Sequence, residues 1–238
     1  IPLACLTGAP LCSKDPVGAK QINFDQIKFI SDNKSNDQMM IFPCTNSGYG
    51  VGEEGVYCDE NTPMRPVSLY GKLKVEIDKL LLDSGNSVTF RFATIFGASP
   101  RMRLDLLVND FTYRALIDRT VVLFEANFKR NYLHVRDAAF SFLHTIDNYT
   151  KMVGEPFNVG LSDANLSKKE LCESIKKEIP EFQYVISEIG KDPDQRNYIV
   201  SNAKIEKTGF ETKVSLSDGI RELIRAFQII RRNQYSNI

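Results

Sequence analysis

Apolar runs of two kinds alternate along the chain. Short, continuous apolar runs bounded by polar residues are typical of buried parallel strands. They cover residues 1–7, 38–44, 88–96, 121–124 and 155–160. Longer segments between them space their apolar residues three or four positions apart, as one face of a helix requires. The pattern therefore predicts an α/β protein in which a parallel sheet is flanked by helices.

Start and stop signals mark the helices. Asp15-Pro16 opens one that ends near residue 31, because Pro is favoured at the first helical position. Residues 67–83 form another, which closes near Gly85. Ser215, with Asp218 three residues later, caps the last helix. The remaining predicted helices cover residues 104–117, 135–149 and 166–179.

Composition excludes several classes of partner. The chain has 238 residues, with 30 Lys and Arg against 30 Asp and Glu and a formal net charge of zero. This balance gives no electrostatic reason to expect nucleic acid or an anionic membrane as partner. No run of about 18 apolar residues is present, so no membrane span is expected. The chain starts with Ile1 on an apolar run, as if in the middle of a fold.

The five cysteines show no C-x-x-C spacing, and neither His134 nor His144 is close to them in the sequence. A zinc site needs about four clustered ligands, so no metal site is expected. An odd number of cysteines without a disulfide framework favours reduced thiols and a cytoplasmic location.

The main chemical signal lies between residues 45 and 74. Tyr70 and Lys74 are four residues apart on the predicted helix, so their side chains share one face. A neighbouring ammonium stabilises a phenolate and so lowers the pKa of a tyrosine. Thr45 directly follows a predicted strand, where ligands bind in open α/β sheets. Its hydroxyl can hydrogen-bond a substrate oxygen while Tyr70 exchanges the proton.

Five segments carry a resemblance to a known family. They are CTNSGYG (44–50), SLYGKLKVE (68–76), RFATIFG (91–97), RNYLHVRDAA (130–139) and FNVG (157–160). In this order they resemble the extended short-chain dehydrogenase/reductases, and among these the NAD-dependent nucleotide-sugar epimerases and dehydratases. The resemblance covers almost the whole chain and implies a Rossmann-like fold. It identifies the superfamily but not the sugar, the nucleotide or the carbon that reacts.

The resemblance implies a role for each matching residue. Tyr70 would be the catalytic acid/base, Lys74 would hold the nicotinamide ribose, and Thr45 would bind the sugar hydroxyl that becomes a ketone. Ala4 and Thr94 would lie beside the cofactor, which would be NAD, with NADP not excluded.

The other matching positions would contact the nucleotide sugar. They are Asn46, Ser47, Asn109, Arg130 and Arg196, of which the last three would face the diphosphate. Arg suits that role because its planar fork binds phosphate oxygens in pairs. A surface ion pair is the alternative for Arg130 and Arg196.

Two departures from the family pattern select among reactions. The dehydratases typically have Asp and Glu after the catalytic Thr, but this chain has Asn46 and Ser47. An amide and a hydroxyl do no acid/base work near neutral pH. The pattern therefore favours epimerisation through a transient keto-sugar. Dehydration, keto-sugar reduction or a non-catalytic binding module on the same fold are the alternatives.

The glycine-rich fingerprint of dinucleotide-binding proteins is not found where it is expected. Gly50-Val51-Gly52-Glu53-Glu54-Gly55 matches the spacing, but no helix follows it and two acidic residues would repel phosphate. We therefore expect a fragment that lacks the first strand–helix units and binds NAD poorly, so that the fragment itself is inactive.

The expected domains are residues 1–98, the C-terminal part of the NAD-binding domain, and residues 99–238, mainly the substrate domain. The helix and strand at 134–160 would return to the first sheet. The resemblance also implies a homodimer through the helices at 16–30 and 66–83. His134 and Asp137 are expected to have structural roles, with Asp137 paired locally.

Overall fold

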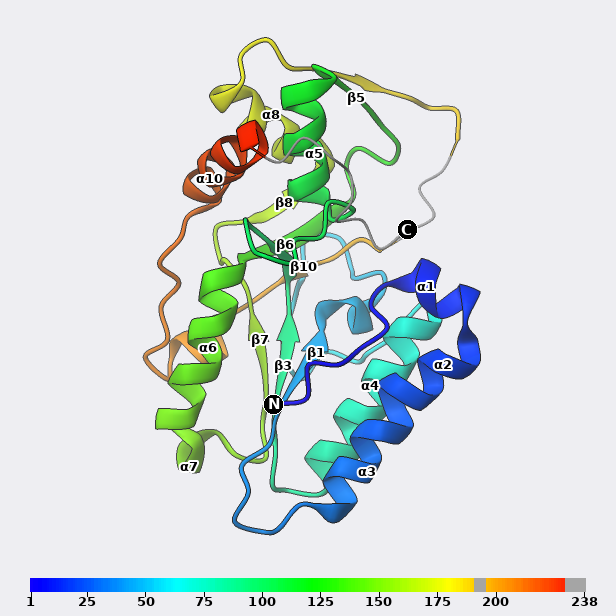
Figure 1. Cartoon of the computed structure of the whole chain (residues 1–238), viewed down its shortest axis with the longest axis vertical. Helices are drawn as coiled ribbons and strands as arrows, with labels where there is room; N and C mark the ends of the chain where they lie inside the picture. The colour runs from blue at the N-terminus through cyan, green and yellow to red at the C-terminus, as the bar shows by residue number, and fades with distance from the viewer. Residues whose placement is uncertain (191–195, 230–238) are drawn as a thin grey trace.

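In the computed structural model, which describes residues 1–190 and 196–229, the main sheet has three parallel strands (Figure 1). Their order is β1 (Ile41–Thr45), β3 (Val88–Phe92) and β7 (Pro156–Val159). Every residue of β3 is buried, as expected for a central strand covered on both faces. The predicted α/β architecture with a parallel sheet is confirmed.

Helices cover both faces of this sheet (Figure 1). On one face lie α2 (Pro16–Lys20), the π-helical turn η1 (Gln21–Asp25), α3 (Gln26–Asn33) and α4 (Leu69–Asp83), preceded by α1 (Ala9–Lys14). Ile27, Phe42 and Ile77 are buried between these helices and β1. The opposite face is covered by α6 (Val135–Asp147) and α7 (Tyr149–Met152), whose side chains pack against Phe90 and Phe157.

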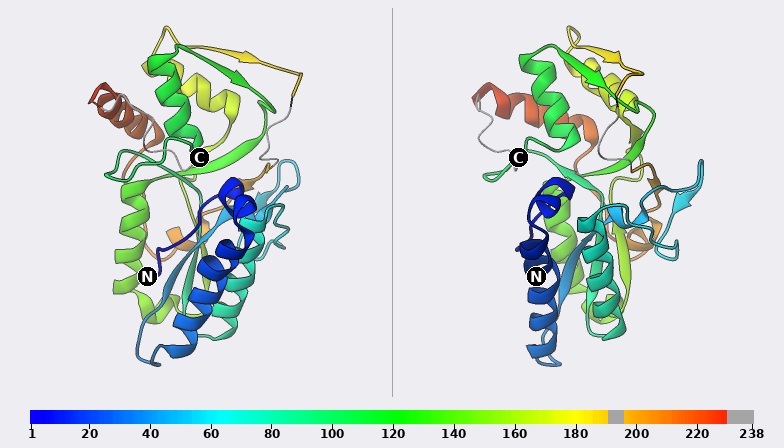
Figure 2. Two further views of the ribbon diagram at one scale, coloured as in Figure 1. Left: turned by 45° about the vertical axis from the view of Figure 1, so that its right-hand side comes forward. Right: turned by 90° about the vertical axis from the view of Figure 1, so that its right-hand side faces the viewer.

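A second lobe lies beyond the carboxyl ends of the main strands (Figures 1 and 2). Its core is formed by α5 (Leu107–Ile117), α8 (Lys168–Glu178) and α10 (Leu216–Ile229). β6 (Lys129–His134) pairs in parallel with β4 (Thr94–Phe96) and antiparallel with β8 (Asn165–Ser167). Two further parallel pairs are β5 (Thr120–Leu123) with β9 (Gln183–Ile186), and β2 (Tyr57–Cys58) with β10 (Ile199–Val200), which precedes α9 (Ala203–Glu206).

Residues 1–7 form no strand, contrary to expectation. Leu3 is 68% exposed, and the segment passes in front of the sheet towards α1 (Figure 1). At Leu6, the side chain of the buried Asn23 of η1 forms the hydrogen bonds that a neighbouring strand would otherwise form. Its Oδ1 accepts from the Leu6 N–H at 2.8 Å, and its Nδ2 donates to the Leu6 carbonyl at 2.9 Å. One side chain thus satisfies both backbone groups that a sheet would otherwise pair.

The predicted strand 88–96 is divided at Ala93. The Ala93 N–H still donates to Val159 of β7 at 2.9 Å, but the chain then leaves the main sheet. From Thr94 it pairs with β6, so a single apolar run serves two sheets. The apolar pattern is the same in both, and it therefore could not reveal the division.

A buried cation links the sheet to its surroundings. Arg91, the residue before the last of β3, forms an ion pair with Asp78 of α4 at 3.1 Å. It also donates to the Glu60 carbonyl oxygen at 2.8 Å and to the Tyr49 hydroxyl at 3.4 Å. The Tyr49 hydroxyl in turn donates to Asn158 of β7 at 2.7 Å. The network therefore ties two strands, one helix and the 46–66 loop together.

Asp137 is buried and its partners are distant in the sequence, so the local pairing expected for it is wrong. Its two carboxylate oxygens accept from the backbone N–H groups of Lys213 and Val214, at 2.9 and 3.0 Å. The carboxylate thus fixes the segment that leads into α10. A charged acceptor with two backbone donors is a strong anchor.

We expect Asp78→Ala to destabilise the fold strongly, because Arg91 would then be buried without its counter-ion. Removal of one partner of a buried pair costs about 3–5 kcal/mol. Asp32→Ala, which removes the exposed Lys28–Asp32 pair, is the matched control and should cost about 0.2–1 kcal/mol. Urea unfolding followed by circular dichroism measures both, and similar losses in the two variants would contradict the role of Arg91.

Candidate active site at the carboxyl end of β1

Thr45 is the last residue of β1 and caps the 3₁₀ turn η2 (Asn46–Tyr49). Its Oγ1 accepts from the Ser47 N–H at 3.1 Å and lies 2.9 Å from the Ser47 hydroxyl. Two hydroxyl groups therefore lie side by side where the strand ends. Thr45 is half-buried, so its hydroxyl is placed at a partly open edge of the sheet.

Tyr70 lies in the first turn of α4, which is packed directly on η2. Ser68 caps the helix by accepting from the Gly71 N–H at 3.1 Å. A Cβ on Gly71 would lie 3.0 Å from Pro66 and 3.5 Å from the Ser47 carbonyl oxygen. Gly71 thus lets the turn that carries Tyr70 approach the turn that carries Ser47. Gly71 was not among the predicted site residues, although its place next to Tyr70 was a possible signal.

Burial raises the pKa of the Tyr70 phenol above its ordinary value, and Cys5 and Cys44 act in the same direction. Arg196 and Arg103 act in the opposite direction, so both guanidinium groups are near the phenol. The spacing of Tyr70 and Lys74 on the helix predicted instead that Lys74 lowers this pKa. Burial outweighs the nearby positive charge, and Tyr70 is a neutral phenol at pH 7.

Lys74 shares the helix face of Tyr70, but its ammonium is held by β1. Its Nζ donates to the Pro43 carbonyl oxygen at 2.8 Å and lies 4.4 Å from the centre of the Phe42 ring. The side chain is only 4% exposed. In this arrangement Lys74 stabilises the edge of the sheet.

The N-terminal segment covers Tyr70. Leu6 and Tyr70 pack against the same buried cluster, which contains Cys12 and Leu73. Ala4, expected beside the cofactor, is exposed on this segment. Since Asn23 holds Leu6 in place, the cover is a built part of the fold.

Asn46 is 1% exposed, and neither its amide nitrogen nor its amide oxygen has a hydrogen-bond partner. A buried, unpaired amide is unfavourable unless something else binds it. Asn46 directly follows Thr45 in the chain and precedes the buried Ser47. Thr94 is half-buried and begins β4, where it pairs with Tyr132.

The three expected diphosphate contacts differ in their surroundings. Asn109 is buried, accepts from the Gly97 N–H at 3.0 Å and donates to the Arg103 carbonyl at 2.8 Å, so it fixes the 97–103 loop. Arg130 is 1% exposed and lies 5.6 Å from the centre of the Tyr198 ring. Arg196 is half-buried near Tyr70. The structure thus brings Arg196 to Tyr70 and adds Arg103, which the loop sequence GASPRMR could have suggested.

His134 is fully buried. Its Nδ1 accepts from the Arg136 N–H at 3.2 Å and caps α6, and its Nε2 lies 3.2 Å from the carboxylate of Glu222 on α10. Burial lowers the pKa of His134, although Glu222 acts against this effect. These contacts give His134 a structural role at the junction of α6 and α10, as expected.

The glycine-rich segment 50–55 is no phosphate-binding turn. It leads into the short strand β2, and its Gly52 N–H donates to the Asn197 carbonyl at 2.8 Å. Gly50 has a φ of +69°, and a Cβ there would lie 2.1 Å from the Arg65 carbonyl oxygen. Gly50 and Gly52 therefore serve close packing with neighbouring segments. No helix N-terminus follows to attract a pyrophosphate.

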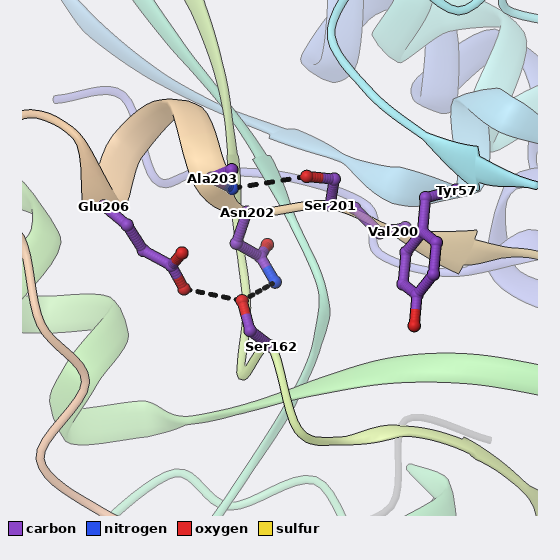
Figure 3. A pocket seen from close by; sticks show the side chains of 7 residues that line it. All are labelled: Tyr57, Ser162, Val200, Ser201, Asn202, Ala203 and Glu206. Atoms are coloured by element: carbon purple, nitrogen blue, oxygen red, sulfur yellow. Dashed lines mark hydrogen bonds between the residues drawn. The ribbon is translucent and has the colours of Figure 1, made fainter.

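A separate cavity of about 330 Å³ lies between β2, β10 and α9 (Figure 3). Ser162 at its base donates to Glu206 at 2.5 Å and accepts from Asn202 at 3.4 Å. None of the residues that line it belongs to the predicted site. Within the described ranges, no group of three or more His, Cys, Asp or Glu could hold a metal ion. In that same part of the chain, no helix is long and apolar enough to cross a membrane.

Comparison with known proteins gives one family match. The model of the NAD dependent epimerase/dehydratase family matches residues 27–160. A Bacillus subtilis protein named uncharacterized UDP-glucose epimerase YtcB is 25% identical over 191 residues, and the match covers 77% of this chain. The chain spans 58% of the length of that relative.

Solved structures share the fold. A UDP-glucose 4-epimerase from Thermotoga maritima, solved with UDP-glucose, has a TM-score of 0.82 at 20% identity. The likeness covers 97% of this chain and 77% of that epimerase. RMD from Pseudomonas aeruginosa, complexed with NADPH, has a TM-score of 0.81 at 17% identity. That likeness covers 96% of this chain and 80% of RMD.

We expect the 238-residue chain to bind NAD more weakly than micromolar. The one glycine-rich loop with the right spacing leads into a strand, and the Lys74 ammonium is engaged by β1. Isothermal titration of the chain with NAD measures this. Binding at micromolar affinity would contradict it, and a circular dichroism spectrum of the same sample controls for folding.

Proposed function

The chain belongs to the NAD-dependent epimerase/dehydratase family, and we propose that the protein is a nucleotide-sugar epimerase that acts through transient oxidation to a keto-sugar. The observation that carries the proposal is the contact between two turns. Gly71 lets the turn with Tyr70 pack on η2, the turn that Thr45 caps. A phenol and an alcohol on adjacent turns can both hydrogen-bond the same sugar hydroxyl.

In this proposal, Thr45 hydrogen-bonds the reacting hydroxyl and Tyr70 takes its proton. The proton transfer requires the pKa of Tyr70 to fall from its raised value. Arg103 and Arg196 already act in that direction. Removal of the cover at Leu6 would act in the same direction, because burial is the main cause of the raised pKa.

We assign Tyr70 and Lys74 to the nicotinamide ribose of NAD, with Ala4 and Thr94 beside it. For this role the Lys74 ammonium has to exchange the Pro43 carbonyl for the ribose. NAD, when bound, accepts the hydride and returns it to the other face of the sugar. The 50–55 segment does not fit its pyrophosphate, because it leads into β2 rather than into a helix. NADPH in RMD keeps NADP as an alternative.

We assign the nucleotide diphosphate to Arg196 and Arg130. The charge of Arg196 lowers the pKa of Tyr70, so a cation that can bind phosphate lies on the same side of the fold as the proposed acid/base. Asn109 contributes through the 97–103 loop that it fixes at both ends. Asn46 and Ser47 are proposed to bind the sugar, and the unpaired amide of Asn46 supports this role.

Epimerisation is preferred to dehydration because of Asn46 and Ser47. Expulsion of water needs a group that gives a proton and one that takes a proton beside the sugar. Neither an amide nor a hydroxyl does so near neutral pH. Epimerisation needs only the proton exchange at the reacting hydroxyl that Thr45 and Tyr70 can perform, with the hydride accepted and returned by NAD when it is bound.

A homodimer through α2–α3 and α4 is part of the proposal. Val17 and Phe29 on the first of these segments are 68% and 66% exposed, and Val67 just before α4 is 53% exposed. Apolar side chains of this size favour burial against a second copy.

Tyr70→Phe tests the function. Loss of the phenolic hydroxyl removes the acid/base, and turnover should fall about 10²–10⁴-fold. NMR analysis of products from UDP-, GDP-, CDP- and dTDP-sugars measures the reaction and identifies the substrate.

Tyr57→Phe is the matched control, since Tyr57 is an exposed tyrosine of β2 outside the proposed machinery. It should keep full turnover. Equal turnover of Tyr70→Phe and the natural protein would refute the assignment of Tyr70.

A further inference from the structure

The thiols of Cys5 and Cys12, near the segment that covers Tyr70, both point to the carbonyl oxygen of Leu6. The Sγ of Cys5 donates to the Leu6 carbonyl oxygen at 3.5 Å, and the Sγ of Cys12 donates to the same oxygen at 3.2 Å. Two sulfur atoms that share an acceptor are close neighbours. The other three cysteines are all buried elsewhere, and Cys44, for example, donates to the Lys74 carbonyl.

The backbone between these thiols is fixed at several points. Asn23 binds both backbone groups of Leu6, and its Nδ2 also lies 3.6 Å from the Cys12 sulfur. Gly8, with a φ of +98°, turns the chain into α1, and the Cys12 N–H donates back to the Gly8 carbonyl at 3.3 Å. The tight turn returns Cys12 to Leu6 and so to its neighbour Cys5.

The two thiols differ in accessibility. Cys5 is half-buried, whereas Cys12 is fully buried. Burial raises the pKa of the Cys12 thiol, and a charge on Cys5 would raise it further. An oxidant from solution therefore meets Cys5 first, and Cys12 is placed to react second.

We propose that Cys5 and Cys12 form a disulfide bond under mild oxidation and thereby lock the N-terminal segment over Tyr70. A peroxide converts the Cys5 thiol to a sulfenic acid and is itself reduced to water. The Cys12 sulfur then attacks the Cys5 sulfur, the S–S bond forms, and the hydroxyl leaves as a second water. Two S–H bonds are broken, and the two electrons lost by sulfur reduce the peroxide.

The bond would close a covalent ring over residues 5–12. Leu6, which packs against the same cluster as Tyr70, lies inside that ring. The reduced form can release the cover, whereas the oxidised form retains it. The proposal concerns the cover alone and does not depend on the reaction proposed for Tyr70.

Peroxide treatment of the chain, followed by alkylation in denaturant and peptide mapping, tests this proposal. We expect the number of free thiols to fall from the five of the reduced chain to three, with one linked peptide that joins Cys5 to Cys12. Hydrogen exchange of residues 5–12 should slow in the oxidised form and recover after treatment with dithiothreitol.

Cys5→Ser introduces a hydroxyl that can donate to the Leu6 carbonyl, so the fold should be preserved. After peroxide treatment this variant should keep all four of its thiols. Cys58→Ser is the matched control, because Cys58 is a buried cysteine outside this cluster. This variant should still lose two free thiols after peroxide treatment. Five thiols after treatment, a link from Cys5 to Cys44, or a bond between two chains would each overturn the proposal.

Discussion

The arrangement of the candidate site depends on one buried positive charge, the guanidinium of Arg91. A charge within a central strand is tolerated only when it is paired and hydrogen-bonded. Its partners are Asp78 on α4, the Glu60 carbonyl and the Tyr49 hydroxyl. Since α4 also carries Tyr70 and η2 follows Thr45, the needs of one cation fix both elements relative to β3. The geometry of the surface site is thus set from within the core.

Much of the fold could be predicted from the sequence where a local signal decides it. The Asp15 side chain accepts from the Gly18 N–H at the predicted helix start, and Ser167 forms a capping box with Glu170. Such signals involve only residues within one turn of each other. The apolar runs of β1, β3 and β7 likewise reflect burial on both faces. These elements were predicted because their causes are contiguous in the sequence.

The remaining features depend on distant partners. Residues 1–7 have the composition of a strand, yet Asn23, 17 positions after Leu6, binds the backbone groups that a sheet would have paired. Tyr70 and Lys74 share a helix face as predicted, but β1 holds the ammonium and the N-terminal segment buries the phenol. The spacing of two residues on a helix fixes their direction. It does not fix the charge state of the phenol, which depends on what covers it.

The hydrogen bonds between Asn23 and Leu6 determine how easily the N-terminal segment can move away from Tyr70. The cover over Tyr70 belongs to no sheet, and Asn23 holds it at Leu6 through two hydrogen bonds, each worth about 0.5–1.5 kcal/mol, beside the thiol contacts of Cys5 and Cys12 with the same carbonyl. Its release therefore breaks no strand pairing and leaves the Arg91 network untouched. In energetic terms the segment is a separate opening unit, which can fluctuate at a far smaller free energy than global unfolding. Solvent access to Tyr70 is then governed by a local equilibrium, one that the stability of the whole domain does not report.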